Sequence, residues 1–149
     1  MPRNTTTAEN VIRSGALLLL VIYVVGGCER NNPFDLVAVN GTLTYDDGTL
    51  IPAKQIILKF EPLAPSLDPK THPPSGMSYV DLSNGTFDVV TSYKYADGLI
   101  RGKHRVLVAA TGGGGDSKSL VPEEYLDSGR TPLLVDTAES PFRLVVRKP

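Results

Sequence analysis

The sequence has no tryptophan, a single cysteine, Cys28, and only two histidines, His72 and His104. A lone cysteine cannot form a disulfide within the chain, so the fold must be stable without a covalent cross-link. The two histidines show no metal-ligand spacing, and no Gly-x-Ser-x-Gly motif is present to indicate a hydrolase. The sequence therefore predicts no catalytic residue, no metal ligand and no cofactor.

An excess of charge of one sign is also missing. Lys and Arg number 15, Asp and Glu number 16, and the net charge is −1. Both signs are interspersed along the chain, whereas a protein that binds nucleic acid carries a basic patch or stripe. Nucleic acid is therefore not an expected partner.

The longest apolar run is too short to remain as a transmembrane helix. It reads ALLLLVIYVV from Ala16 to Val25, about half of the roughly 20 residues that a membrane-spanning helix needs. Arg3 and Arg13 precede it with only Glu9 opposing them, which is the positive start typical of an export signal. The pattern predicts a secretion signal, with an uncleaved signal anchor as the alternative.

Four residues at the end of the apolar run resemble the bacterial lipobox: Val25, Gly26, Gly27 and Cys28. In that motif a dedicated peptidase cuts before a cysteine whose thiol has received a diacylglycerol. Small residues before the cut let the extended backbone enter a narrow protease cleft. The resemblance implies peptidase recognition at the first three positions and lipidation at Cys28. The alternative is an ordinary buried thiol at Cys28.

The lipobox divides the chain into three parts. A signal peptide covers residues 1–27, a lipidated tether covers 28–35, and a single domain covers 36–149. Acyl chains on Cys28 would hold the domain permanently at the membrane, so membrane lipid is its first expected partner. The domain is expected outside the cytoplasm, on the inner or the outer membrane.

The domain contains short segments in which every second residue is apolar. In the first segment Val37, Val39, Gly41, Leu43 and Tyr45 share one face, which is the pattern of a strand with one buried side. Further strands are predicted at residues 55–61, 77–82, 86–91, 104–110, 133–136 and 142–147.

Turn residues separate these segments. Gly48, after Asp46 and Asp47, can take the positive φ that a turn requires. The turn Ser83-Asn84-Gly85, with its Asn-Gly pair, predicts a tight hairpin between the strands at 77–82 and 86–91, with Phe87 and Val89 inward and Asp88 in water.

Three longer connections are expected between the strands. Five prolines prevent regular pairing over residues 62–74, and a glycine-rich loop covers 111–119. The loop at 92–102 carries Tyr93 and Tyr95, whose rings are the candidate binding residues of the chain, with packing against a hairpin as the alternative. One helical turn is expected around residues 123–126.

Seven short strands, each with one apolar face, escape water when their faces pack together. The predicted fold class is therefore all-β, and the predicted architecture is a seven-stranded antiparallel β-sandwich with Greek-key connections.

Six short motifs follow one another within the predicted domain: VNGTLTYDDG at 39–48, LIPA at 50–53, NGTF at 84–87, GKHRVLV at 102–108, VPEEY at 121–125 and TPL at 131–133. Their order over residues 36–147 resembles the carboxypeptidase regulatory-like, or transthyretin-like (prealbumin-like), domain of small bacterial lipoproteins. His104 stands where the family commonly has an inward aromatic residue, which implies a half-buried packing role for it.

The resemblance implies an accessory β-sandwich without catalytic activity, acting as a lipid-anchored interaction or structural module. Its partner would be an envelope protein or polysaccharide. Two alternatives stay open: a small-ligand carrier of the transthyretin type, and a hydrolase. Hydrolases on this fold use a Tyr-Arg-Gly-Ser tail, where this chain reads Val146-Arg147-Lys148-Pro149.

Replacing Cys28 with alanine is expected to leave the precursor uncut and free of lipid, because the acyl group is transferred to the thiol. Gel mobility and partition into detergent report both effects. A variant of normal mature size that still enters the detergent phase would refute lipidation at this residue.

Overall fold

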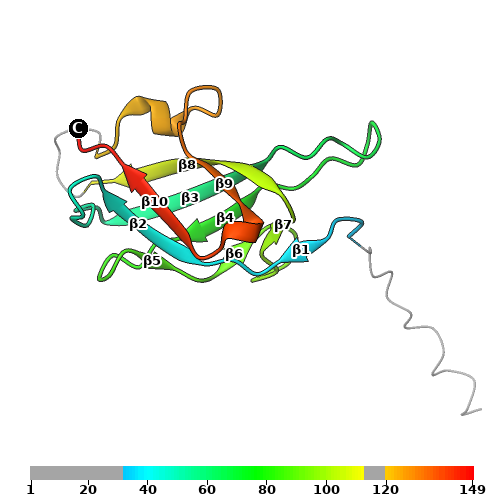
Figure 1. Ribbon diagram of the computed structural model, residues 1–149, viewed down its shortest axis with the longest axis horizontal. Coiled ribbons are helices and arrows are strands. Elements are labelled where there is room, and N and C mark those ends of the chain that lie inside the picture. Colours follow the sequence, from blue (N-terminus) through cyan, green and yellow to red (C-terminus); the bar gives the residue numbers. More distant parts are fainter. Residues whose placement is uncertain (1–31, 113–119) are drawn as a thin grey trace, which may run out of the picture. The chain divides into compact units, whose positions relative to one another are not determined.

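The alternating apolar residues form short strands that pair into several β-sheets, as the computed structural model shows for residues 32–112 and 120–149 (Figure 1). The predicted all-β fold class is confirmed, since these residues contain strands, two single 3-10 turns and no α-helix. The signal segment, the lipobox and residues 113–119 of the expected glycine-rich loop lie outside the described residues.

The largest sheet has five antiparallel strands in the order β6-β4-β3-β8-β9. Its members are β6 (Val90–Thr91), β4 (Gly76–Tyr79), β3 (Gln55–Pro62), β8 (Lys103–Thr111) and β9 (Leu134–Asp136). The central pair, β3 and β8, is in register from Gln55 opposite Thr111 to Pro62 opposite His104. Alternate residues of both strands therefore point to the same side of the sheet.

The second sheet has three strands in the order β10-β2-β5. They are β10 (Phe142–Val146), β2 (Gly41–Tyr45) and β5 (Thr86–Phe87). A separate pair joins β1 (Leu36–Val37) to β7 (Leu99–Ile100). The two 3-10 turns are η1 (Glu123–Leu126), where one helical turn was expected, and η2 (Thr137–Glu139).

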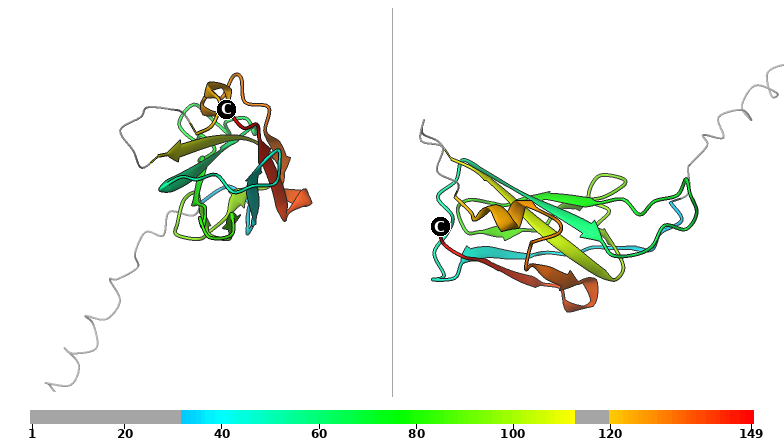
Figure 2. Two further views of the ribbon diagram at one scale, coloured as in Figure 1. Left: turned by 90° about the vertical axis from the view of Figure 1, so that its left-hand side faces the viewer. Right: turned by 90° about the horizontal axis from the view of Figure 1, so that it is seen from above.

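The two larger sheets face each other across one hydrophobic core, and Figure 2 shows β2 and β10 as a layer apart from β3, β4 and β8. The ring of Phe60 on β3 lies 5.9 Å from that of Phe87 on β5 and 6.2 Å from that of Phe142 on β10. Tilted rings at this spacing add attraction to the burial of apolar area. The three rings therefore link one sheet to the other.

The expectation that every strand pair is antiparallel is wrong at one place. β10 pairs parallel with β2, with Phe142 opposite Gly41 and Val146 opposite Tyr45. After β9 the chain passes through η2 to the other sheet, and the N–H of Phe142 donates to the carbonyl of Asn40 just before β2 begins. β10 therefore enters the sheet at the same end as β2.

The seven predicted segments appear as nine strands, because the segment at 37–45 divides into β1 and β2 and the segment at 86–91 into β5 and β6. A tenth strand, β7, lies within the expected loop at 92–102. At both divisions the chain passes from one sheet to another, so a continuous strand cannot form.

The predicted hairpin pairs as expected at its far end, where β4 is antiparallel to β6 with Met77 opposite Thr91 and Ser78 opposite Val90, but its tight Asn-Gly turn is wrong. The N–H of Gly85 donates to the carbonyl of Asp81 at 2.7 Å, and the N–H of Asp81 donates to the carbonyl of Thr86 at 2.8 Å. These two bonds close a wider turn. Gly85 keeps the expected positive φ, 74°. Beyond the turn, β5 pairs with β2 in the opposite sheet, and the chain returns to β4 only at β6.

Crossing between sheets shifts the alternation by one residue. Phe87 is buried and Asp88 is exposed, as predicted, but Val89 is 38% exposed and Val90 takes the inward position. The alternation at β2, β3, β8 and β10 and the positive φ of Gly48 are as predicted.

Truncating Phe87 to alanine is expected to lower the free energy of unfolding by about 3 to 5 kcal/mol, because the ring fills the space between the sheets. Val89→Ala, two residues away and exposed, is the matched control and should cost less than about 1 kcal/mol. Urea unfolding of both variants measures the difference. Equal losses would contradict the observed inward and outward positions.

Candidate interaction site

The two tyrosines singled out from the sequence lie on the loop that follows β6. Tyr95 is 82% exposed and Tyr93 is 44% exposed. Neither ring is buried in the core, so both offer aromatic surface to a partner. We call residues 92–98 the tyrosine loop.

Asp97 organises the backbone of the tyrosine loop. Its carboxylate accepts hydrogen bonds from the N–H of Ser92 at 2.8 Å, of Tyr93 at 2.9 Å and of Lys94. The Ser92 hydroxyl donates to the carbonyl of Gly98 at 2.6 Å. Bonds of this kind fix a turn without regular strand pairing. The loop therefore holds Tyr95 out on an ordered backbone, which lowers the entropic cost of binding through it.

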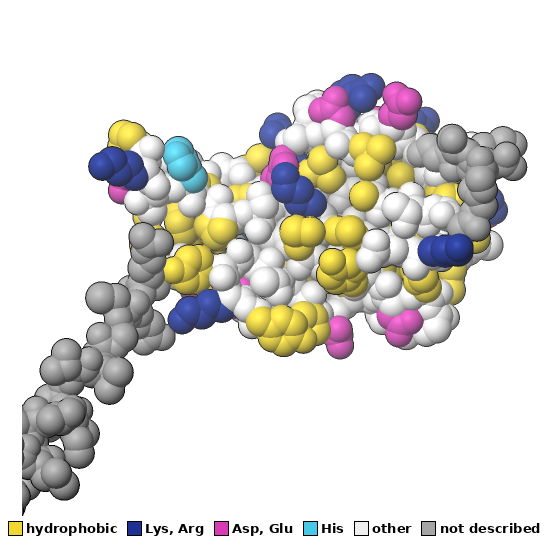
Figure 3. Space-filling view, turned by 180° about the vertical axis from the view of Figure 1, so that it is seen from behind, with side chains coloured by type: hydrophobic (Ala, Val, Ile, Leu, Met, Phe, Trp, Pro, Cys, Tyr) yellow, Lys and Arg dark blue, Asp and Glu magenta, His cyan; other side chains and the backbone are white. Residues whose placement is uncertain are grey.

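Exposed apolar side chains continue from this loop onto the outer face of the five-stranded sheet. Tyr79 on β4 is 63% exposed and lies opposite Ile57 of β3, while Met77 lies opposite Thr91, two residues before Tyr93. We define the β4 face as Ile57, Met77, Tyr79 and Val89. Figure 3 shows hydrophobic side chains gathered over the middle of this side of the molecule. Patches of this type commonly mark interaction sites.

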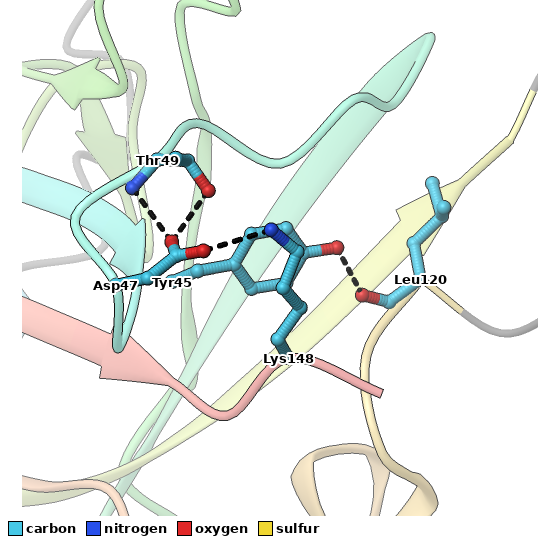
Figure 4. Close-up of polar contacts among 5 residues, drawn as sticks. All are labelled: Tyr45, Asp47, Thr49, Leu120 and Lys148. Atoms are coloured by element: carbon cyan, nitrogen blue, oxygen red, sulfur yellow. Dashed lines mark hydrogen bonds and ion pairs between the residues drawn. The ribbon is translucent and has the colours of Figure 1, made fainter.

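A second feature is an open pocket at the end of the molecule where β2 finishes. It has a volume of about 730 Å³ and is lined by Tyr45, Thr49, Leu50, Pro52, Leu120, Lys148 and Pro149. Tyr45 is buried, and its hydroxyl donates to the carbonyl of Leu120 at 2.7 Å (Figure 4). Ligand pockets generally have this size and this excess of apolar lining.

An ion pair lies at the rim of the pocket. Lys148 Nζ lies 2.8 Å from Asp47 Oδ2 and 5.4 Å from the centre of the Tyr45 ring, and Thr49 donates two hydrogen bonds to the other Asp47 oxygen (Figure 4). These contacts hold the pKa of Asp47 well below its usual range, and the hydrogen bond from Lys148 contributes most to this shift. The same pair raises the pKa of Lys148, and burial raises that of Tyr45. The pocket can thus take an apolar group against Tyr45, while an anionic ligand must compete with Asp47 for the ammonium.

His104 is fully buried, at 1% exposure, so the half-buried role expected for it is wrong. Its place on β8 turns the side chain into the core, because Val106 and Val108 share that face. Nδ1 lies 3.2 Å from the carbonyl of Gly102 and donates to it, whereas Nε2 has no hydrogen-bond partner within the described chain. Burial lowers the pKa of His104, so the fold holds the neutral ring.

His72 lies in the proline-rich loop, where Nδ1 is 2.7 Å from the hydroxyl of Ser66. Across residues 32–112 and 120–149, no group of three His, Cys, Asp or Glu side chains is placed to hold a metal ion. In the same part of the chain no helix is long and apolar enough to span a membrane. The lipobox residues Val25, Gly26, Gly27 and Cys28 lie outside the described residues.

Comparison of the chain with protein-family models, curated proteins and solved structures finds no match.

No pattern in the sequence predicted the pocket at Tyr45. Its residues come from the turn after β2, the segment before η1 and the segment after β10, which are far apart along the chain. The parallel pairing of Val146 with Tyr45 brings Lys148 beside Asp47, and that pairing was not predicted.

The buried neutral His104 should make the protein less stable in mild acid. Its pKa in the folded state is below the ordinary 6.5, so the unfolded chain binds the proton more readily and stability falls as the pH drops through 6.5 towards the folded-state pKa. His104→Gln keeps a donor for Gly102 but cannot titrate in this range, so it should lose less stability between about pH 7.5 and pH 5. His72→Gln, in the exposed proline-rich loop away from the core, is the control for the substitution itself. Identical pH profiles for all three proteins would contradict this assignment.

Proposed function

We propose that this chain is a lipid-anchored, non-catalytic binding module of the bacterial cell envelope. Cys28 would carry the acyl chains after removal of residues 1–27, and the domain at 36–149 would hold an envelope protein or polysaccharide near the membrane. The resemblance to the carboxypeptidase regulatory-like, or transthyretin-like, domain supports this assignment through the order of its motifs.

The finer architecture that we propose is the seven-stranded Greek-key sandwich of that family. Its seven strands would correspond to β1 with β2, β3, β4, β5 with β6, β8, β9 and β10. The five-stranded and three-stranded sheets support this correspondence. The parallel β10–β2 pair departs from an all-antiparallel arrangement.

The observation that carries the proposed function is the tyrosine loop beside the β4 face. Aromatic rings are enriched at the energetic centres of protein interfaces, and their faces also pack against other flat apolar surfaces. Asp97 holds three backbone N–H groups of this loop, so Tyr95 stays exposed without a mobile backbone. Met77 and Tyr79 extend the same apolar surface along β4.

Affinity capture from an envelope fraction of the source cell tests this proposal. The full-length protein is expected to retain a specific protein or polysaccharide, and a Tyr93→Ser, Tyr95→Ser double variant should retain at least about tenfold less. Leu134→Ser changes an exposed apolar residue at the opposite edge of the same sheet and is the matched control. Failure to capture anything specific, or equal capture by all variants, would contradict the proposal.

The small-ligand carrier is kept as a second candidate because of the pocket at Tyr45. The transthyretin type of carrier needs a cavity between protomers, whereas this pocket is lined by residues of one chain. Native mass spectrometry of the protein used for capture separates the two functions. A binding module should appear at the mass of the protein alone, and a carrier should retain a small molecule.

A further inference from the structure

The proline-rich loop at residues 63–75 projects from the end of the domain at which the described chain begins. Both features lie at the right in Figure 1 and in the right-hand view of Figure 2. Hydrogen bonds tie them to one short segment: the N–H of Leu63 donates to the carbonyl of Lys103 at 2.9 Å, and that of Arg101 donates to the carbonyl of Asp35 at 2.8 Å. Arg101 Nε also lies 2.6 Å from Asp35 Oδ2.

The tip of this loop has an ordered backbone. The N–H of Leu67 donates to the carbonyl of Thr71 at 3.0 Å. The carboxylate of Asp68 accepts hydrogen bonds from the N–H of Lys70, the N–H of Thr71 and the Thr71 hydroxyl. Prolines on both sides of the tip fix φ and limit the other conformations of the loop. Leu67, which is 59% exposed, is therefore held out in water on a stiff support.

The length of the tether places this end of the domain at the membrane. Three residues, 29–31, separate Cys28 from Asn32. Because consecutive Cα atoms are about 3.8 Å apart, Asn32 can lie at most about 15 Å from Cys28. This step rests on the proposed lipidation of Cys28, which would hold that residue at the bilayer surface. The proline-rich loop, at the same end as Asn32, then faces the lipid.

We infer that the tip of the proline-rich loop is a second membrane contact, with Leu67 packing into the headgroup region of the bilayer that holds the anchor. Leu67 is exposed, and the Asp68 carboxylate beside it is occupied by bonds within the loop. A loop that is already ordered loses little conformational entropy when its apolar side chains bind at a surface. Two contacts would fix the orientation of the domain, with the pocket at Tyr45 directed away from the membrane, since the segments that line it, the end of β2 and the C-terminus, lie at the opposite end of the domain (Figure 1).

The test uses full-length protein, purified from membranes and reconstituted in vesicles of phosphatidylethanolamine and phosphatidylglycerol. A lipidated Cys28 has no free thiol, so Lys70→Cys provides one labelling site beside Leu67 for an environment-sensitive fluorophore. Asp46→Cys, in the exposed turn at the opposite end of the domain, is the matched control. Brominated lipids in the vesicles quench only a fluorophore that reaches the bilayer.

The label at residue 70 is expected to shift to shorter wavelength on reconstitution and to be quenched by brominated lipid, while the label at residue 46 is not. Adding Leu67→Ser should abolish the quenching at residue 70 without releasing the protein from vesicles. Protein that floats with the vesicles but shows no quenching, or equal quenching at both sites, overturns the loop contact and leaves the anchor intact. Protein that fails to float and labels at two thiols overturns the anchor itself, and the loop contact with it.

Discussion

Contact between the two facing sheets is the interaction on which the rest of this structure depends. The described chain contains no cysteine, so no disulfide stabilises the domain, and the sheets are joined by side-chain burial. Phe60 reaches from β3 to Phe87 on β5 and Phe142 on β10, which belong to different strands of the opposite sheet. Because the core fixes both layers, the loops at their ends can carry exposed apolar groups without threatening the fold.

Short-range polar contacts stabilise the three surface features that we propose for interaction: the tyrosine loop, the proline-rich loop and the pocket at Tyr45. Asp97 orders the tyrosine loop, Asp68 orders the proline-rich loop, and Asp47 pairs with Lys148 at the rim of the pocket. In each case a carboxylate near the surface accepts bonds from neighbouring backbone or side-chain donors, which stabilises an irregular conformation. Beside Asp97 and Asp68 the side chains of Tyr95 and Leu67 remain exposed.

Local patterns predicted most of the strands but could not predict how the strands associate. The period-two pattern located β3, β8 and β10 because each keeps one buried face along its whole length. It failed at Val89, where the chain leaves one sheet for the other and the inward position passes to Val90. The parallel β10–β2 pair depends on contacts across about 100 residues, so the pocket beside Lys148 had no local signal. Tyr93 and Tyr95 were found because two aromatic residues in a polar loop stand out without knowledge of the fold.

We propose that the domain works at the end of a very short lipid tether on Cys28. Such a tether would determine which end of the domain meets the bilayer, and would leave the pocket end, and with it Lys148, facing the envelope. Mass spectrometry of the protein extracted from its native membrane tests this claim most directly. We predict a chain that begins at Cys28 and carries a diacylglycerol on its sulfur. A chain that retains residues 1–27 and has a free sulfhydryl at Cys28 would contradict the account.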